Sequence, residues 1–179
     1  MKETRNNFVK LGLALAFALF VCAFVSAQDV TSNAMPGVDF SKYHTYKWVP
    51  IEGATYPNQI VDAQIKASID SQLASKGLTK TDGEKADLLI GYQASVQQEK
   101  QWNAYSTGGM RWGGGMASAQ QSTISIGTLV ADMYDPTNKQ LVWTGRATKT
   151  LDPNDSQAKK QKNLDKAMAK LFKNFPPKS

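Results

Sequence analysis

The sequence from 123 to 150, TISIGTLVADMYDPTNKQLVWTGRATKT, predicts two strands joined by a short turn. Apolar residues fall on alternate positions on both sides of the turn, as expected where one face of a strand is buried. Pro136 presets the backbone of the turn, and Asn138 tolerates a left-handed conformation there. The parity of the apolar positions changes at Gly127, where we expect a β-bulge. Two strands with so short a connection should pair antiparallel.

Four more elements flank this hairpin. Aromatic residues within 38–49 predict a first strand. After Asn58, a good helix N-cap, apolar residues recur every four positions and predict a helix that ends at Gly77. Alternating apolar residues in 88–97 predict another strand, and an apolar face within 164–175 predicts a last helix.

The resulting order is strand, helix, strand, strand, strand, helix, which predicts an α+β fold. An antiparallel sheet of about four strands with both helices on one face is the simplest way to bury the apolar stripes. We expect residues 38–179 to form this single domain. The segment 28–37 is polar and without a period, so we expect a flexible lead-in. The glycine-rich segment at about 103–120 is expected to be a loop, because glycine disfavours regular structure.

Residues 1–27 have the features of a secretory signal peptide. Basic residues precede an apolar run, and small residues up to Ala27 offer a cleavage site. We therefore expect a mature chain that begins at Gln28, is periplasmic or secreted, and has no transmembrane span after processing. The run is shorter than the about 20 apolar residues of a membrane anchor. The other alternative, an outer-membrane lipid anchor through Cys22, is disfavoured by the bulky Val21 before it.

Charge and cysteine content exclude several classes of function. The chain has 21 Lys and Arg against 15 Asp and Glu, a net charge of +6, but no long block of like charge. We therefore expect no nucleic-acid partner. The single cysteine lies in the leader, so the mature domain should have neither disulfides nor a cysteine nucleophile.

No catalytic, cofactor or metal site is expected. His44 is the sole histidine, and its neighbours offer no ligand set for a metal ion. Asp132 and Asp135 flank one turn, while Asp152 and Asp155 flank the last loop, positions where aspartate usually closes turns and caps helices. We therefore expect a protein that is not an enzyme. The alternative is a carboxylate-dependent hydrolase of an envelope substrate that uses Asp132 or Asp135.

Residues Trp102, Tyr105, Arg111 and Trp112 are the candidate contacts to a partner, because aromatic and arginine side chains anchor interfaces. The alternative is that these aromatic side chains fold back onto the sheet. The partner is expected to be an envelope protein, a cell-wall component or a lipid. The domain itself is expected to be a monomer, with self-association through a sheet edge as a further alternative.

Five short segments resemble a known family when they are taken in order. They are Asp39-Phe40 with Tyr43, Tyr46 and Trp48; Ala86-Asp87-Leu88-Leu89-Ile90; Gly127-Thr128-Leu129 followed by Asp132 and Asp135; Leu141-Val142-Trp143-Thr144-Gly145; and Leu171-Phe172 with Phe175-Pro176-Pro177. This order resembles the bacterial envelope family catalogued as domain of unknown function 4136. The resemblance implies a secreted or lipid-anchored α+β domain without an established biochemical role or recognised catalytic residues. Many relatives look like lipoproteins, a pattern from which Val21 departs.

Overall fold

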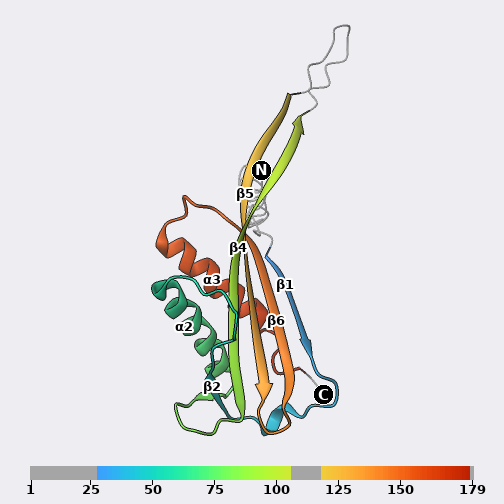
Figure 1. Cartoon of the computed structure of the whole chain (residues 1–179), viewed down its shortest axis with the longest axis vertical. Coiled ribbons are helices and arrows are strands. Elements are labelled where there is room, and N and C mark those ends of the chain that lie inside the picture. Colours follow the sequence, from blue (N-terminus) through green and yellow to red (C-terminus); the bar gives the residue numbers. More distant parts are fainter. Residues whose placement is uncertain (1–27, 106–117, 178–179) are drawn as a thin grey trace, which may run out of the picture.

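A six-stranded sheet forms the centre of the computed structural model, which describes residues 28–105 and 118–177, with the backbone alone for 101–105 and 118–121. The strands are β1 (Asp29–Ala34), β2 (Thr45–Trp48), β3 (Thr79–Lys80), β4 (Leu88–Tyr105), β5 (Ser118–Asp135) and β6 (Gln140–Leu151). Their order in the sheet is β1-β6-β5-β4-β2-β3 (Figure 1).

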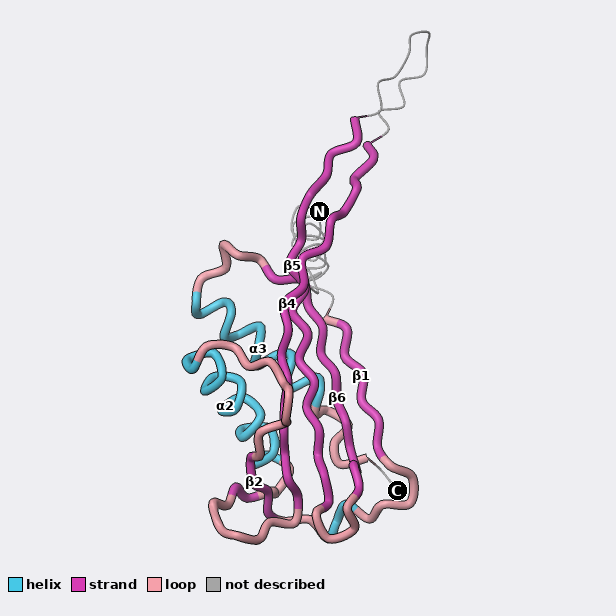
Figure 2. The backbone as a smooth tube through the Cα atoms, in the orientation of Figure 1, coloured by secondary structure: helices cyan, strands magenta, loops and turns pink. Residues whose placement is uncertain are grey.

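Two helices cover one face of this sheet, and the core lies between the two layers (Figure 2). They are α2 (Gln59–Ser75) and α3 (Gln157–Leu171), and a short 3-10 helix, η1 (Phe40–Lys42), precedes β2. Trp143 of β6 stacks on Phe172 just after α3, with the ring centroids 5.0 Å apart. Gly145 faces the same layer, and the space that a side chain would take there is filled by Trp143 and Leu171.

Both ends of α2 agree with the prediction from sequence. The side chain of Asn58 accepts a hydrogen bond from the Val61 N–H at 3.1 Å, which caps the first turn. After the helix, Gly77 has a φ of +87°, a left-handed conformation that glycine adopts at little cost. The apolar face between these ends, with Ile69 and Leu73 fully buried, packs on the sheet.

The sheet differs from the expected one in strand number and direction. It has six strands and not four, and it is mixed, because β2 pairs parallel with both β3 and β4. The α+β class is confirmed, but the purely antiparallel sheet is wrong. The helix α2 connects β2 to these two strands, and a helical connection returns the chain in its original direction, which makes the pairing parallel.

The two additional strands lie where the sequence shows no strand pattern. β1 occupies the segment expected as a flexible lead-in and pairs antiparallel with β6 along its whole length, from Asp29 opposite Thr148 to Ala34 opposite Trp143. The pairing fixes this segment through backbone hydrogen bonds, which need no apolar period. β3 has only two residues, both of them exposed.

Two local expectations also need correction. The first strand is shorter than 38–49, because η1 takes up part of that segment before β2 begins at Thr45. The pairing runs through Gly127 without a bulge, and the register shift lies instead between Met133 and Tyr134. The two apolar parities of β5 are therefore not brought to one face at Gly127.

None of the helices within residues 28–105 and 118–177 has the length and apolar character needed to cross a membrane.

Candidate functional site

The most distinctive feature of the molecule is a two-stranded ribbon that projects beyond the helices and the other strands (Figures 1 and 2). We use the name ribbon for residues 99–105 of β4 together with 118–124 of β5, which lie opposite each other. The pairing of β5 with β6 ends at Ser125 opposite Leu151, whereas its pairing with β4 continues to Ser118 opposite Tyr105. At about 3.3 Å per residue, the ribbon is about 20 Å long.

The ribbon has no neighbouring strand at either outer edge within the described residues. The last described backbone contact beside β4 is the Ala94 N–H donating to the Thr55 carbonyl at 3.3 Å. An antiparallel strand turns every second residue toward its neighbour, so the alternate residues of each outer edge present their backbone groups outward. A two-stranded ribbon of this kind is at best marginally stable alone in water.

The ribbon is almost uncharged and rich in amide and hydroxyl side chains. Its only charged residues are Glu99 and Lys100, both exposed, and neither forms an ion pair within the described part of the chain. Residues 118–124 of β5 contain no charge, proline or glycine. Natural edge strands commonly carry such residues because they block pairing with other strands. The edge formed by β5 lacks this protection.

The structure places two of the four candidate contact residues on the ribbon. Trp102 lies opposite Gln121 and Tyr105 lies opposite Ser118, so the segment expected as a loop at about 103–120 is in part strand. The backbone of β4 is regular there because each residue pairs with one of β5. Arg111 and Trp112 lie outside the described residues.

The carboxylate of Asp135 accepts five hydrogen bonds. It accepts hydrogen bonds from the Tyr43 hydroxyl at 2.8 Å, the Lys42 ammonium at 3.3 Å, the Thr137 N–H at 2.8 Å, and the backbone and side-chain N–H groups of Asn138 at 3.0 and 2.7 Å. Burial raises the pKa of this carboxyl, but the bonds donated by Asn138, Tyr43 and Lys42 outweigh burial and hold the pKa well below its usual range. The group stays ionised and closes the turn between β5 and β6.

Asp132 lies on the opposite face of the sheet from its neighbour Met133, which is fully buried in the core. Its carboxylate accepts a hydrogen bond of 2.6 Å from the hydroxyl of Thr144, directly across in β6. Asp135 is thus bonded within the turn between β5 and β6, and Asp132 is bonded across the strand pair to Thr144.

Two acids of α2 fasten the helix to the sheet. Asp70 accepts from the Tyr46 hydroxyl at 2.7 Å and from the Trp48 indole N–H at 2.8 Å. About two turns earlier in α2, Asp62 accepts a hydrogen bond from the Tyr92 hydroxyl at 2.5 Å, and this bond lowers the pKa of Asp62. These contacts explain why two tyrosines and a tryptophan lie on the strands under α2.

The acids of the last loop are structural as well. Asp152 accepts from the Asn154 N–H at 2.9 Å. Asp155 forms an ion pair of 2.6 Å with Lys159 in the first turn of α3, and Ser156 caps that helix. The loop therefore provides helix-capping and turn contacts.

Asp87 links two strands, a role that was not predicted from the sequence. Its carboxylate accepts from the N–H groups of His44 and Thr45, both at 2.8 Å, and from the Thr45 hydroxyl at 2.9 Å. It therefore fixes the start of β2 against the start of β4. The usable signal was an aspartate directly before a strongly apolar strand, a frequent position for turn-closing contacts.

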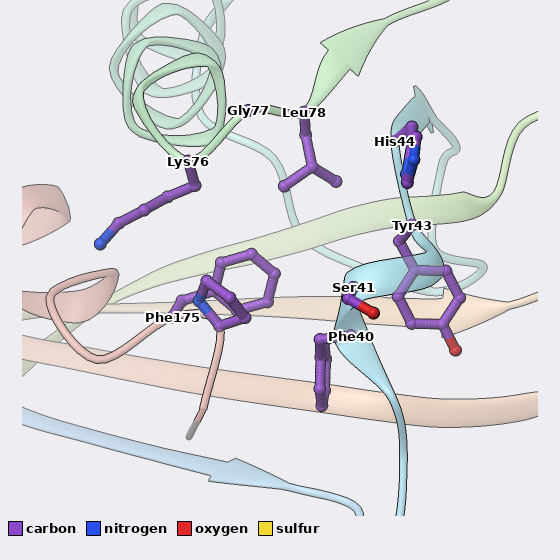
Figure 3. Close-up of a pocket in the computed structure, with 9 residues that line it drawn as sticks. Phe40, Ser41, Tyr43, His44, Lys76, Gly77, Leu78 and Phe175 are labelled. Carbon is purple, nitrogen blue, oxygen red and sulfur yellow. The ribbon is translucent and has the colours of Figure 1, made fainter. Parts of the chain in front are cut away.

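A cavity of about 260 Å³ opens between η1 and the end of α2 (Figure 3). It is lined by Phe40, Ser41, Tyr43, His44, Lys76, Gly77, Leu78, Phe175 and Pro176. The rings of Phe40 and Phe175 meet edge to face, with centroids 5.7 Å apart. His44 is exposed at its margin, and the lining includes no carboxylate. The lining thus combines aromatic rings with the polar side chains of Ser41, His44 and Lys76.

Among the described residues, no three histidine, cysteine, aspartate or glutamate side chains cluster closely enough to hold a metal ion.

The fold and this geometry define a class: a small α+β domain with a mixed sheet, one helical layer and a projecting β-ribbon. The chain belongs to the family described as Domain of unknown function (DUF4136), whose profile matches residues 30–177. The family inferred from the ordered sequence segments is thus confirmed. No protein with a curated description matches the chain.

Solved structures with similar folds have low sequence identity to this chain. A PDZ domain protein from Parabacteroides distasonis has a TM-score of 0.57 and 17% identity; the match covers 93% of this chain and 40% of that protein. This chain therefore spans less than half of that relative. The PelC dodecamer from Paraburkholderia phytofirmans has a TM-score of 0.53 and 11% identity, and the match covers 86% of this chain and 100% of PelC.

Proposed function

We propose that this chain is a non-catalytic interaction domain of the bacterial envelope that binds or scaffolds a partner through its ribbon. The observation that carries the proposal is the long β4–β5 pair, which extends past β6 and presents two outer edges without a strand neighbour in the described residues. Such edges recognise other chains by adding a strand to the sheet. The rest of the domain, which we call the body, supports the ribbon. It has a buried apolar core, and its turn acid Asp135 is hydrogen-bonded to Tyr43.

The acids support an interaction role over the hydrolase alternative. Asp135 accepts hydrogen bonds from Tyr43 and from Asn138 of the turn. Asp62 and Asp70 accept hydrogen bonds from aromatic side chains of the sheet. A general acid or base needs a carboxyl that is able to exchange its proton with a substrate. No observation on the described residues favours hydrolysis.

β1 begins beside the root of the ribbon. Asp29 is level with Thr148 and Thr128, so the first described residues lie at the same end of the sheet as the root of the ribbon. A tether at the amino terminus, whether the leader before cleavage or a lipid on Cys22, would turn the ribbon toward the membrane surface. We propose a periplasmic or secreted location, with the lipid anchor as the alternative.

The partner is proposed to be an envelope protein, a cell-wall component or a lipid, contacted by Trp102, Tyr105, Arg111 and Trp112. PelC shares the fold and is described as a dodecamer, so the fold is compatible with assembly through protein contacts.

Capture from envelope extracts tests this function. The bait is the chain from Gln28 to Ser179, beside a variant with Trp102, Tyr105 and Trp112 changed to Ala. A second variant replaces residues 99–124 by an Asn-Gly turn between Gln98 and Ser125, which lie directly opposite each other.

Both variants should lose the captured partner, because the anchors or the whole ribbon are gone. The matched control is Ile60→Ala, which removes an apolar side chain that is 73% exposed on the body. Equal capture by the wild type and the variant without the ribbon would refute the proposed function.

A further inference from the structure

We propose that the ribbon pairs edge to edge with the ribbon of a second copy of this chain, with β4 of one copy beside β5 of the next. The inference rests on the proposed function and names one partner for the same surface. The contact is heterologous, since each copy uses a different edge on each side. It therefore propagates beyond a dimer, into a closed ring or an open array.

The directions of the two strands allow this contact. β4 and β5 run antiparallel within the ribbon, and they form its two outer edges. When two ribbons lie side by side and point the same way, β4 of one copy meets β5 of the other, again antiparallel. The contact between copies then repeats the pairing that already exists within each chain.

The side chains of the two edges are also compatible with this contact. Within one chain, Glu99 already lies opposite Ile124 and Lys100 opposite Thr123, so the residue types of β4 and β5 are compatible across a strand pair. Residues 118–124 carry no charge, and the adjacent Glu99 and Lys100 of β4 cancel. Two copies with a net positive charge can therefore approach at the ribbons without like charges facing each other.

The edges of the body are shorter than the ribbon and carry charged residues. β3 is two residues long and carries Lys80, and β1 carries Asp29. Short strands and charged side chains are the usual protection against unwanted strand pairing. The ribbon is longer than either body edge, and its β5 edge has no such protection. A second ribbon would also relieve the marginal stability of a lone strand pair.

Disulfide trapping tests which edges meet. The chain from Gln28 has no cysteine, so single cysteines report contacts without background. Copies with Lys100→Cys, or in parallel Gln98→Cys, are mixed with copies carrying Thr123→Cys. These positions share one face, because Lys100 lies opposite Thr123 and Gln98 is two residues from Lys100. The mixtures should form mixed disulfides, and each variant alone should not. A Lys100→Cys variant that links to itself as efficiently as the mixture would overturn the β4-to-β5 contact.

Sedimentation velocity over a range of concentrations tests the assembly itself. The wild type should form species larger than a dimer, and Thr123→Lys should weaken this association by about tenfold, since it places a charge on the β5 edge. The control, Thr31→Lys, makes the same change at an exposed position of the body edge strand β1 and should leave association unchanged. Equal weakening by both variants would place the contact on the body and overturn the proposal.

A wild type that is monomeric at every concentration would also overturn this inference. That result would leave the proposed function intact, provided that capture from envelope extracts still depends on the ribbon. Capture that is independent of the ribbon would refute the proposed function whatever the sedimentation shows.

Discussion

Asp135 shows at the scale of a residue why a buried acid in this protein is structural. Its side chain is 3% exposed, yet the charge is stabilised by donors from Tyr43, Lys42, Thr137 and Asn138. Hydrogen bonds to an ionised group contribute more than neutral ones, and losing them leaves buried donors without acceptors. The sequence indicated an aspartate that closes a turn, but Tyr43 and Lys42 are about ninety residues away and no local pattern connects them to it.

The Asp135→Asn variant should lower the free energy of unfolding at pH 7 by about 2 kcal/mol, since a neutral amide offers a single acceptor oxygen to these donors. Urea denaturation at constant temperature measures the change. The control is Asp82→Asn, because Asp82 is exposed and has no hydrogen bond within the described part of the chain. A loss at Asp135 no greater than that at Asp82 would contradict the account.

The stability conferred by Asp135 should depend on pH. Because its pKa in the folded state lies below the unfolded value, the carboxylate stabilises the fold above about pH 4, and this stability is lost as the pH falls through the folded-state pKa. The difference between the wild type and Asp135→Asn should therefore shrink between pH 7 and about pH 3. Urea titrations across this range check it, and a constant difference would show that the charge of Asp135 is not responsible.

Gly145 carries a second residue-scale prediction. A methyl group there would collide with the Trp143 ring and approach Leu171 to 2.8 Å, and both are tightly packed against α3 and the segment after it. Gly145→Ala should cost about 2 kcal/mol of unfolding free energy. Gly127→Ala is the control, because its new methyl meets only the half-exposed Leu151 side chain, which can move. Equal thermal shifts in both variants would contradict this packing.

At the scale of an element, α2 is held on the sheet by its apolar face and by two carboxylates that accept from aromatic side chains. The period of the apolar residues and the caps at Asn58 and Gly77 were enough to predict this helix, because those signals are local. The bonds of Asp62 and Asp70 were not predicted. They depend on Tyr92, Tyr46 and Trp48 meeting the helix in three dimensions.

Asp70→Ala should therefore destabilise the protein by about 2 kcal/mol, because it removes the acceptor of the Tyr46 hydroxyl and the Trp48 indole together. Chemical denaturation followed by tryptophan fluorescence measures the loss directly beside Trp48. Ser71→Ala, an exposed position next to it on α2, is the control. A free energy of unfolding unchanged from the wild type would mean that these bonds do not hold α2.

Only some of the strands could be predicted from the sequence. Residues 88–97 and 123–150 have apolar alternation, so three long strands were predicted, together with the antiparallel pairing of the last two. β1 and β3 have no such alternation, because a strand at the edge of a sheet is fixed by backbone bonds more than by burial. Their assignment, and the parallel direction of β2, depend on contacts between distant segments.

At the scale of the whole molecule, a body with a closed core carries a ribbon none of whose described side chains belongs to that core. The sequence suggested Trp102, Tyr105, Arg111 and Trp112 as candidate contacts, since residue types common at interfaces are visible in a sequence. It did not indicate the ribbon, because amide and hydroxyl residues give no apolar alternation, and 103–105 and 118–120 read as loop. The unprotected edges became visible only when the neighbours of each strand were known.

Division into body and ribbon predicts that the body is stable alone. Replacing residues 99–124 by an Asn-Gly turn should change the free energy of unfolding by less than about 1 kcal/mol, because none of the side chains described in this segment belongs to the core. Urea denaturation of the dilute, dissociated chain gives this value. A large loss would mean that the ribbon is part of the folding unit, and its absence would then say little about binding.

The decisive measurement is the capture of envelope components by the chain without residues 99–124, compared with the wild type at equal loading. If the ribbon binds the partner, the variant is folded and no longer captures it. Capture of the same partner in the same amount by the folded variant would show that the ribbon is not the binding surface.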